Sequence, residues 1–262
     1  MILFDRQATL QIGGKLYKSD DIDIEFNVPF STENEPDVSE ISIYNLSPTS
    51  IATIKKGTKV ILNAGYGNNI GMLISGVVAS FKTTIETVDK KTTMKVATAL
   101  NAWKEIKVHK TYAKGTTTKD ILNDLIANFG VTVADMSLVK NVTYKKGKTI
   151  SGKLKDVVKR LVKESDSKFY MDKDRAYVRA FNKGTQSGFV LSGATGLIGS
   201  PEPAEIKEGQ KITRQGWKVK CLLNHNIFTD SIIVLDSKLV KGNFRVVKGK
   251  HTSEWITEME VV

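Results

Sequence analysis

Apolar and polar residues alternate along most of the first hundred residues of the chain. In one such stretch Ile41 and Ile43 fall on one face, while Ser42 and Tyr44 fall on the other. Successive side chains of a β-strand point to opposite faces, so this period of two predicts strands. The pattern recurs in ATLQI (8–12), IDIEFNV (22–28), EISIYNL (40–46), KVILNAGY (59–66), MLISGVVASF (72–81) and TTMKVATA (92–99). Residues 1–102 are therefore predicted to form an N-terminal β-barrel-like domain.

One short helix is predicted to interrupt these strands. Pro48 suits a first helical position, where no backbone N–H is needed, and Ser47 or Thr49 can cap the helix. Lys55, Lys56 and Gly57 then end it. A turn follows the next strand in the segment GYGNN (65–69), whose Gly and Asn residues tolerate positive φ.

The period of the pattern changes between residues 103 and 182. Thr116 or Thr117 can cap a helix that ends at Gly130, and Ser151 can cap a second one. Each helix has one apolar face, formed by Ile121, Leu122, Leu125, Ile126 and Phe129 and by Leu154, Val157, Val158, Leu161 and Val162. VTVAD (131–135) and a hairpin that turns at residues 172–174 follow the helices. The segment 103–182 is predicted to be a small α+β insert domain.

Strand patterns return in residues 183–262, which are predicted to form a C-terminal β-barrel-like domain. The strands expected there are GFVLSG (188–193), QGWKVKCLLN (215–224), DSIIVLDS (230–237), GNFRVVKGKHTS (242–253) and EWITEMEVV (254–262). Pro201 and Pro203 should prevent regular strand pairing, so residues 200–215 are expected to be a crossing loop or linker. The fold class is mainly β with an α+β insert, in which two β-barrel-like domains flank a small helix-and-hairpin domain.

Three segments of the chain together resemble the tail hub proteins of bacteriophages and phage-derived tail particles. They are FDRQATLQIGGKLY (4–17), ISIYNLSPTSIATIKKGTKVILNAGY (41–66) and GWKVKCLLNHNI (216–227). The resemblance covers most of the chain. It implies a structural role in the virion tail baseplate, as a homotrimeric ring that joins the tail tube to the central spike and contacts other baseplate proteins.

Charge is unevenly distributed along the chain. The net charge is +11, and residues 1–50 hold three basic and nine acidic side chains, a balance of −6, so the remainder carries +17. Such polarity suits contact between copies of the same chain, and it equally suits nucleic acid binding. The exposed acidic loop from Ser31 to Asp37 is expected to be able to contact a neighbour.

Two lysine-rich segments, 108–119 and 141–160, interleave Tyr with Lys, as proteins that bind single strands do. Lysines outnumber arginines 33 to 6, and lysine recognises phosphates and bases less specifically than arginine. Solvated faces or surfaces for an acidic partner are therefore the preferred interpretation. Transient, nonspecific contact with DNA in a tail channel is compatible with these segments.

No group of residues has the spacing of a catalytic, cofactor-binding or metal site. The segments GYGNNIG (65–71) and GATGLIG (193–199) lack the spacing of a nucleotide-binding loop. The acidic residues Asp21, Asp23 and Glu25 alternate with apolar ones, which favours a solvated or partner-facing strand face over an active site. We therefore predict no catalytic residues and no enzymatic activity, and we name no cofactor or metal ligand.

The remaining reactive side chains favour structural roles. His225 lies four residues after Cys221, too far apart along a strand for shared metal ligation. Cys221 itself is expected to be a buried apolar residue. The first residues do not form a secretory signal and no membrane-spanning run occurs, so the protein is expected to assemble in the bacterial host cytoplasm and to have no membrane partner. The preferred function is a structural hub; the alternative is a basic β-barrel protein that binds nucleic acid.

Overall fold

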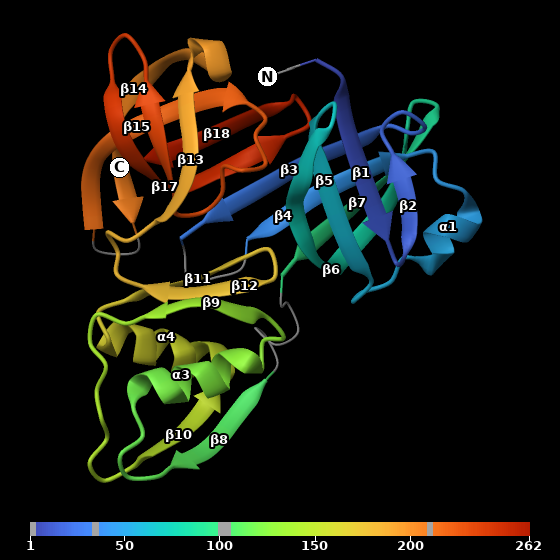
Figure 1. Cartoon of the computed structure of the whole chain (residues 1–262). Coiled ribbons are helices and arrows are strands. Elements are labelled where there is room, and N and C mark those ends of the chain that lie inside the picture. Colours follow the sequence, from blue (N-terminus) through green and yellow to red (C-terminus); the bar gives the residue numbers. More distant parts are fainter. Residues whose placement is uncertain (1–3, 33–36, 99–105, 209–211) are drawn as a thin grey trace. The chain divides into compact units, whose positions relative to one another are not determined.

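A computed structural model describes residues 4–32, 37–98, 106–208 and 212–262 of the chain (Figure 1). It divides into two compact units. One comprises residues 1–31, 37–97 and 184–262 and is here called the β unit; the other comprises residues 98–183, here called the insert, together with residues 32–36. The expected acidic loop falls mainly on residues 33–36, which lie outside the described residues.

The first half of the β unit is built from strands and one short helix. The strands are β1 (Arg6–Ile12), β2 (Lys15–Lys18), β3 (Ile24–Ser31), β4 (Val38–Tyr44), β5 (Lys59–Tyr66), β6 (Asn69–Glu86) and β7 (Asp89–Ala97). The helix α1 (Pro48–Thr53) begins as expected, because the Ser47 side chain accepts a hydrogen bond from the backbone N–H of Ser50. The turn between β5 and β6 also lies where the Gly and Asn residues predict it.

The second half of the β unit follows the insert. It contains β13 (Thr185–Ser192), the single 3₁₀ turn η1 (Gly193–Thr195), β14 (Leu197–Glu208), β15 (Ile212–Leu222), β16 (Ser231–Asp236), β17 (Lys241–Thr252) and β18 (Ile256–Val261). Each predicted strand of this region is present. The expected linker at residues 200–215 is wrong, because most of it belongs to β14 and β15, which pair with each other.

The reason is that β14 is an edge strand. It lies at one end of the sheet, so its outer side needs no backbone donors, and proline is tolerated on such strands. Pro201 also falls within the irregular pairing between Ile198 and Glu202. The regular ladder is interrupted there, so the backbone N–H that proline lacks is not needed for pairing.

A single sheet runs through both halves of the β unit. Its order is β14-β15-β18-β17-β3-β4-β7-β6-β5-β1-β2, with β13 and β16 attached through β17. The halves are joined where β17 pairs with β3. The sheet bends within β6, since residues 69–77 pair with β5 and residues 77–86 pair with β7.

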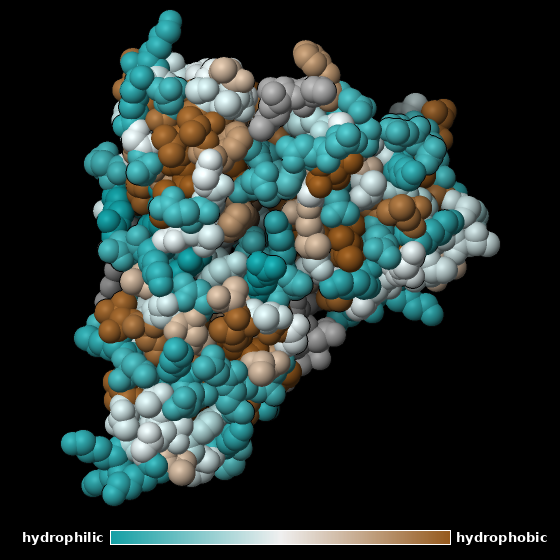
Figure 2. All heavy atoms as spheres, in the orientation of Figure 1, coloured by the Kyte–Doolittle hydropathy of each residue, from teal (hydrophilic) through white to brown (hydrophobic). Residues whose placement is uncertain are grey.

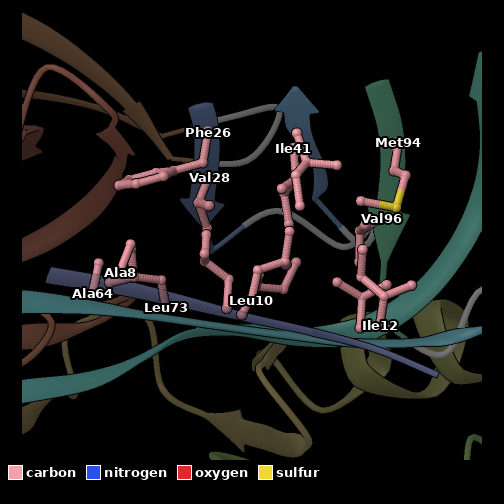
Figure 3. Close-up of a cluster of buried hydrophobic side chains, with 14 of the residues drawn as sticks. Ala8, Leu10, Ile12, Phe26, Val28, Ile41, Ala64, Leu73, Met94 and Val96 are labelled. Atoms are coloured by element: carbon pink, nitrogen blue, oxygen red, sulfur yellow. The ribbon is translucent and has the colours of Figure 1, made fainter. Parts of the chain in front are cut away.

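Each half of the β unit has its own hydrophobic core. In the first, side chains of β3, β4 and β7 point toward those of β1 and β5, so the curled sheet packs against itself (Figure 3). The second core includes Leu191, Val219, Ile233, Val246 and Met259. Trp255 joins the halves: its carbonyl accepts a hydrogen bond from the Tyr66 hydroxyl at 3.2 Å, and its ring lies 5.7 Å from the Tyr66 ring.

The described part of the insert, residues 106–183, contains two helices and two small sheets. Helix α3 (Thr118–Ala127) and helix α4 (Leu154–Glu164) pack with β9 (Thr132–Ser137), β11 (Lys168–Asp172) and β12 (Arg175–Arg179). In that sheet β12 is central and pairs antiparallel with β11 and parallel with β9. The second sheet is a ribbon of β8 (Lys107–Tyr112) and β10 (Lys148–Lys153). The insert has its own core, formed by the predicted apolar faces of both helices.

The mainly β fold with an α+β insert is therefore confirmed, and the separation into three domains at residues 102 and 182 stays a prediction. The cap of α3 is the expected Thr117, which forms a capping box with Asp120. The predicted cap of α4 is wrong: Ser151 lies in β10, and Lys153 occupies the N-cap position without a side-chain cap. Among the described helices, none is long and apolar enough to cross a membrane.

Candidate assembly surfaces

The outward face of the sheet in the second half of the β unit carries rows of alternating charge. Glu258 lies between Lys220 and Lys250 on neighbouring strands, with N–O distances of 2.9 and 3.1 Å. Glu260 pairs with Lys248 at 3.1 Å in the next row. Hydrogen bonds from the two lysines hold the pKa of Glu258 below its ordinary value.

This polar face continues across the junction of the two halves. Residues directly opposite each other in a sheet share a face, and the register links Thr252 to Asn27, Asn27 to Glu40, and Glu40 to Lys95. Both hydrophobic cores lie on the other side of the sheet. The sheet thus presents one extended hydrophilic surface. On the side of the molecule that Figure 2 shows, hydrophilic residues predominate, with hydrophobic patches between them.

An acidic turn precedes β3. Asp20, Asp21 and Asp23 are exposed, and none of them forms an ion pair within the part of the chain that the structure describes. Glu25, on the same face as Asp23, is paired with Lys91 at 2.9 Å. Ile22, Ile24 and Phe26 pack on the first core while Asp21, Asp23 and Glu25 are exposed, as expected, although Asp21 and Ile22 lie in the turn and not in β3. The acidic turn is therefore a partner-facing or solvated surface.

The hairpin of β6 and β7 extends beyond the first core. In residues 79–86, β6 pairs with β7 on one side only, so its other side is an open sheet edge in the described structure. Apolar side chains are exposed along it: Phe81 is 39% exposed, Ile85 75% and Val88 85%. Such an edge can accept a strand from another chain.

No protein-family model matches the sequence, and no curated protein matches it either. Solved structures do match. The 43 kDa tail protein of prophage MuSo2 from Shewanella oneidensis superposes with a TM-score of 0.72, over 98% of this chain and 97% of that one, at 11% identity. The chain has the fold of a phage tail protein.

Two further structures agree with this assignment of the fold. A tail protein from Neisseria meningitidis MC58 has a TM-score of 0.68 at 7% identity, over 98% of this chain and 96% of that one. The c3393 protein of E. coli has a TM-score of 0.65 at 10% identity, over 97% and 76%. It is described as a type VI secretion component similar to the phage T4 tail proteins gp27 and gp5.

Within this tail-protein fold, the basic charge is concentrated in the insert. Residues 98–183 hold nineteen basic and nine acidic side chains, a balance of +10, which leaves +1 for the rest of the chain. The two lysine-rich segments of the sequence both fall here. They form much of the β8–β10 ribbon, the loops beside it and the first turns of α4, and no pattern in the sequence predicted that ribbon.

The side chains considered as chemical candidates are separated in the tail-protein fold. His109 is exposed on β8, His251 is buried and donates to or accepts from Thr257, and the ring of His225 is bonded to Asn69. Cys221 is buried as expected, and burial raises the pKa of its thiol to about 12. Among described residues, no three His, Cys, Asp or Glu side chains group as a metal ion requires.

One buried ionic network was not apparent from the sequence. The Arg245 guanidinium donates to Asp230 at 2.8 Å and to Glu208 at 2.6 Å, and all three side chains are almost wholly buried. Burial alone would lower the pKa of Arg245, but the two carboxylates outweigh it and raise that pKa. Because the three residues come from different strands and loops, only tertiary structure could bring them together.

A second polar cluster lies in the insert, on the face of β11 and β12 that points away from its core. The Lys168 ammonium donates to the carbonyls of Phe181 and Lys183 at 3.0 and 3.2 Å, and the Tyr170 and Tyr177 rings stack 4.9 Å apart. Burial raises the pKa of Asp172, at the end of β11, to about 6. Lys168 thus holds the segment that follows β12, and these residues form no recognisable catalytic arrangement.

Proposed function

We propose that this chain is a structural baseplate hub protein, which forms a trimeric ring between the tail tube and the central spike of a phage-type tail. The observation that carries the proposal is the match of nearly the whole chain to nearly the whole of a prophage tail protein. The three sequence segments that resemble tail hub proteins support it. They fold into β1–β2, into β4–α1–β5 and into β15, which are all parts of the β unit.

The sheet of the β unit supplies the means of assembly. Its edges at β14, β2 and the end of β6 are open in the described structure, and a ring closes such edges against neighbouring copies. Identical copies related by rotation then repeat the same contact until the ring closes. The hub's task in this proposal is mechanical continuity and symmetry matching between tube, spike and other baseplate proteins.

The proposed function requires no catalytic residue in this chain. Cys221 is buried and its thiol is held protonated, and the buried carboxylates Glu208 and Asp230 are bound to Arg245. We therefore propose that the protein is not an enzyme. It would act in the virion tail baseplate after assembly in the bacterial host cytoplasm, with at most transient and nonspecific contact with DNA in the tail channel.

The alternative is a basic protein that binds nucleic acid. The observation that favours it is the +10 balance of the insert, whose lysines would meet phosphates. Such binding would occur on a monomer and would weaken steeply with salt. Binding of a labelled oligonucleotide, measured over a range of salt, separates this alternative from the hub.

The mass of the purified protein in solution tests the hub directly. The chain has a mass of 28.9 kDa, so a trimer has a mass of about 87 kDa by light scattering. A trimer at low salt is the expected result. A protein that remains monomeric at low salt would contradict the proposal, and tight binding of the oligonucleotide by that monomer would favour the alternative.

A further inference from the structure

The outward face of the β8–β10 ribbon is basic and wholly exposed. Its residues point away from the core of the insert, and they are Lys107, His109 and Thr111 of β8 and Thr149, Ser151 and Lys153 of β10. The opposite face holds Ile150, which is buried in that core. Six residues on two strands thus present two ammonium groups, an imidazole and three hydroxyls, without a single carboxylate.

Two lysines of this ribbon face each other, and their mutual repulsion is relieved only when an anion binds between them. Lys107 lies directly opposite Lys153 in the antiparallel register. Like charges that face each other across a strand pair repel. Neither lysine forms an ion pair in the described part of the chain, whereas the inward lysines do: Lys110 binds Asp124 at 2.7 Å and Lys148 lies 3.7 Å from Glu164. The ribbon therefore has the composition of an anion-binding surface.

The chain itself carries a matching anion. The acidic turn before β3 holds Asp20, Asp21 and Asp23, all exposed and without ion pairs among the described residues. The two surfaces have opposite charge. The turn belongs to residues 1–50, whose net charge is −6, and the ribbon belongs to the insert, whose net charge is +10. Complementary potentials steer association and fix its register.

We propose that the outward face of the β8–β10 ribbon binds the acidic turn of a second copy of this chain. The contact is head-to-tail, because one copy contributes the ribbon and the next contributes the turn, and repeated head-to-tail contacts close into a ring when the rotation allows it. This inference rests on the proposed ring and names the surfaces that join its members.

Charge reversal tests the contact, and mass by light scattering is the readout. One variant carries Lys107→Glu and Lys153→Glu; a second carries Asp20→Lys and Asp21→Lys. Each is expected to associate at least about tenfold more weakly than the wild type, because like charges then face each other. The control Lys145→Glu with Lys146→Glu makes the same charge change on an exposed turn off the ribbon, and should assemble like the wild type.

Two restorations make the test specific. A chain with all four reversals has the same complementarity with its signs exchanged, so it should recover the wild-type mass. The two double variants mixed together should assemble only by alternation, which gives even-numbered complexes and no trimer. All positions are exposed, and a far-ultraviolet circular dichroism spectrum confirms that each variant is folded.

The other outcomes are distinguishable. If the wild type is a trimer and the Lys107 and Lys153 variant assembles equally well, the contact is overturned while the ring remains. A wild type that stays monomeric at low salt overturns both. If the wild type binds a labelled oligothymidine tightly, and reversal of Lys107 and Lys153 abolishes that binding without changing the mass, the ribbon is a nucleic acid surface and the inference is wrong.

Discussion

At the scale of single residues, the buried charges determine how much stability the β unit loses when a charged side chain is replaced. Arg245 neutralises two carboxylates that are 2% exposed or less, whereas Arg214 is 44% exposed and lies 3.9 Å from the same Glu208. A buried ion pair adds little over apolar packing, but removal of one partner leaves an uncompensated charge. The two arginines should therefore differ sharply in what their loss costs.

We expect Arg245→Met to lower the free energy of unfolding by about 3–5 kcal/mol, because Glu208 and Asp230 lose their shared counter-charge. Arg214→Met is the matched control and should cost less than about 1 kcal/mol, since an exposed ion pair contributes little. Urea denaturation followed by tryptophan fluorescence measures both. Equal losses in the two variants would show that Arg245 is not the centre of the network.

A pH dependence follows from Asp172. Its pKa of about 6 in the folded chain exceeds the ordinary 3.8, so the folded state binds the proton more tightly. The associated stability is complete below pH 4 and is lost as the pH rises to about 6. Asp172→Asn should remove this loss and be more stable at pH 7, by on the order of 1–2 kcal/mol for a side chain that stays partly exposed.

Thermal unfolding between pH 4 and pH 7 measures this difference. The advantage of Asp172→Asn should vanish toward pH 4. Asp174→Asn, at the exposed neighbouring position, removes a charge of the same sign and should not reproduce that pH dependence. A constant difference between Asp172→Asn and the wild type across the range would contradict the assignment.

At the scale of elements, local signals identified helices and strands well, and failed where neighbouring strands decide. The cap of α3 was predictable because Thr117 and Asp120 have the spacing of a capping box. Ser151 has equally good chemistry, but it is recruited into β10 by pairing with His109 of β8. Likewise, the prolines near residue 200 argue against a central strand and do not exclude an edge strand such as β14.

The two candidate caps give a direct comparison. Thr117→Ala should destabilise the insert by about 1 kcal/mol, because it removes the side-chain bond to the N–H of Asp120. Ser151→Ala, at an exposed strand position, should change stability by no more than about 0.5 kcal/mol. Denaturant midpoints provide the measurement. A larger effect at Ser151 would mean that it caps α4 after all.

At the scale of the whole molecule, each hydrophobic core is formed by residues of one unit. The core of the insert draws only on residues between 106 and 178, and the two cores of the β unit draw on none of these. About eighty residues with such a core are enough for independent folding. The charge separation runs along the same division, with most of the basic excess in the insert.

We therefore expect a fragment of residues 98–183 to fold alone. Its thermal unfolding should be a cooperative transition, followed by circular dichroism, with dispersed amide signals in a nuclear magnetic resonance spectrum. The same fragment with Leu125→Asp and Leu161→Asp, two buried core positions, is the control that should not fold. A disordered wild-type fragment would show that the insert depends on the β unit.

The sequence by itself determined most strands of the β unit, with β2 and β14 as exceptions, together with both main helices and the buried state of Cys221; the tail-protein fold came from the resemblance of three segments to tail hub proteins. The alternation of apolar and polar residues, the capping residues and the spacing of apolar residues are local features of the sequence. They predict an element wherever one of its faces is buried. The tertiary structure alone decided that one sheet joins the two β halves through β17 and β3, and that Glu208, Asp230 and Arg245 meet. It also decided that Lys107 faces Lys153. These are contacts between residues far apart in sequence, and strand register, which no local pattern specifies, brings them together.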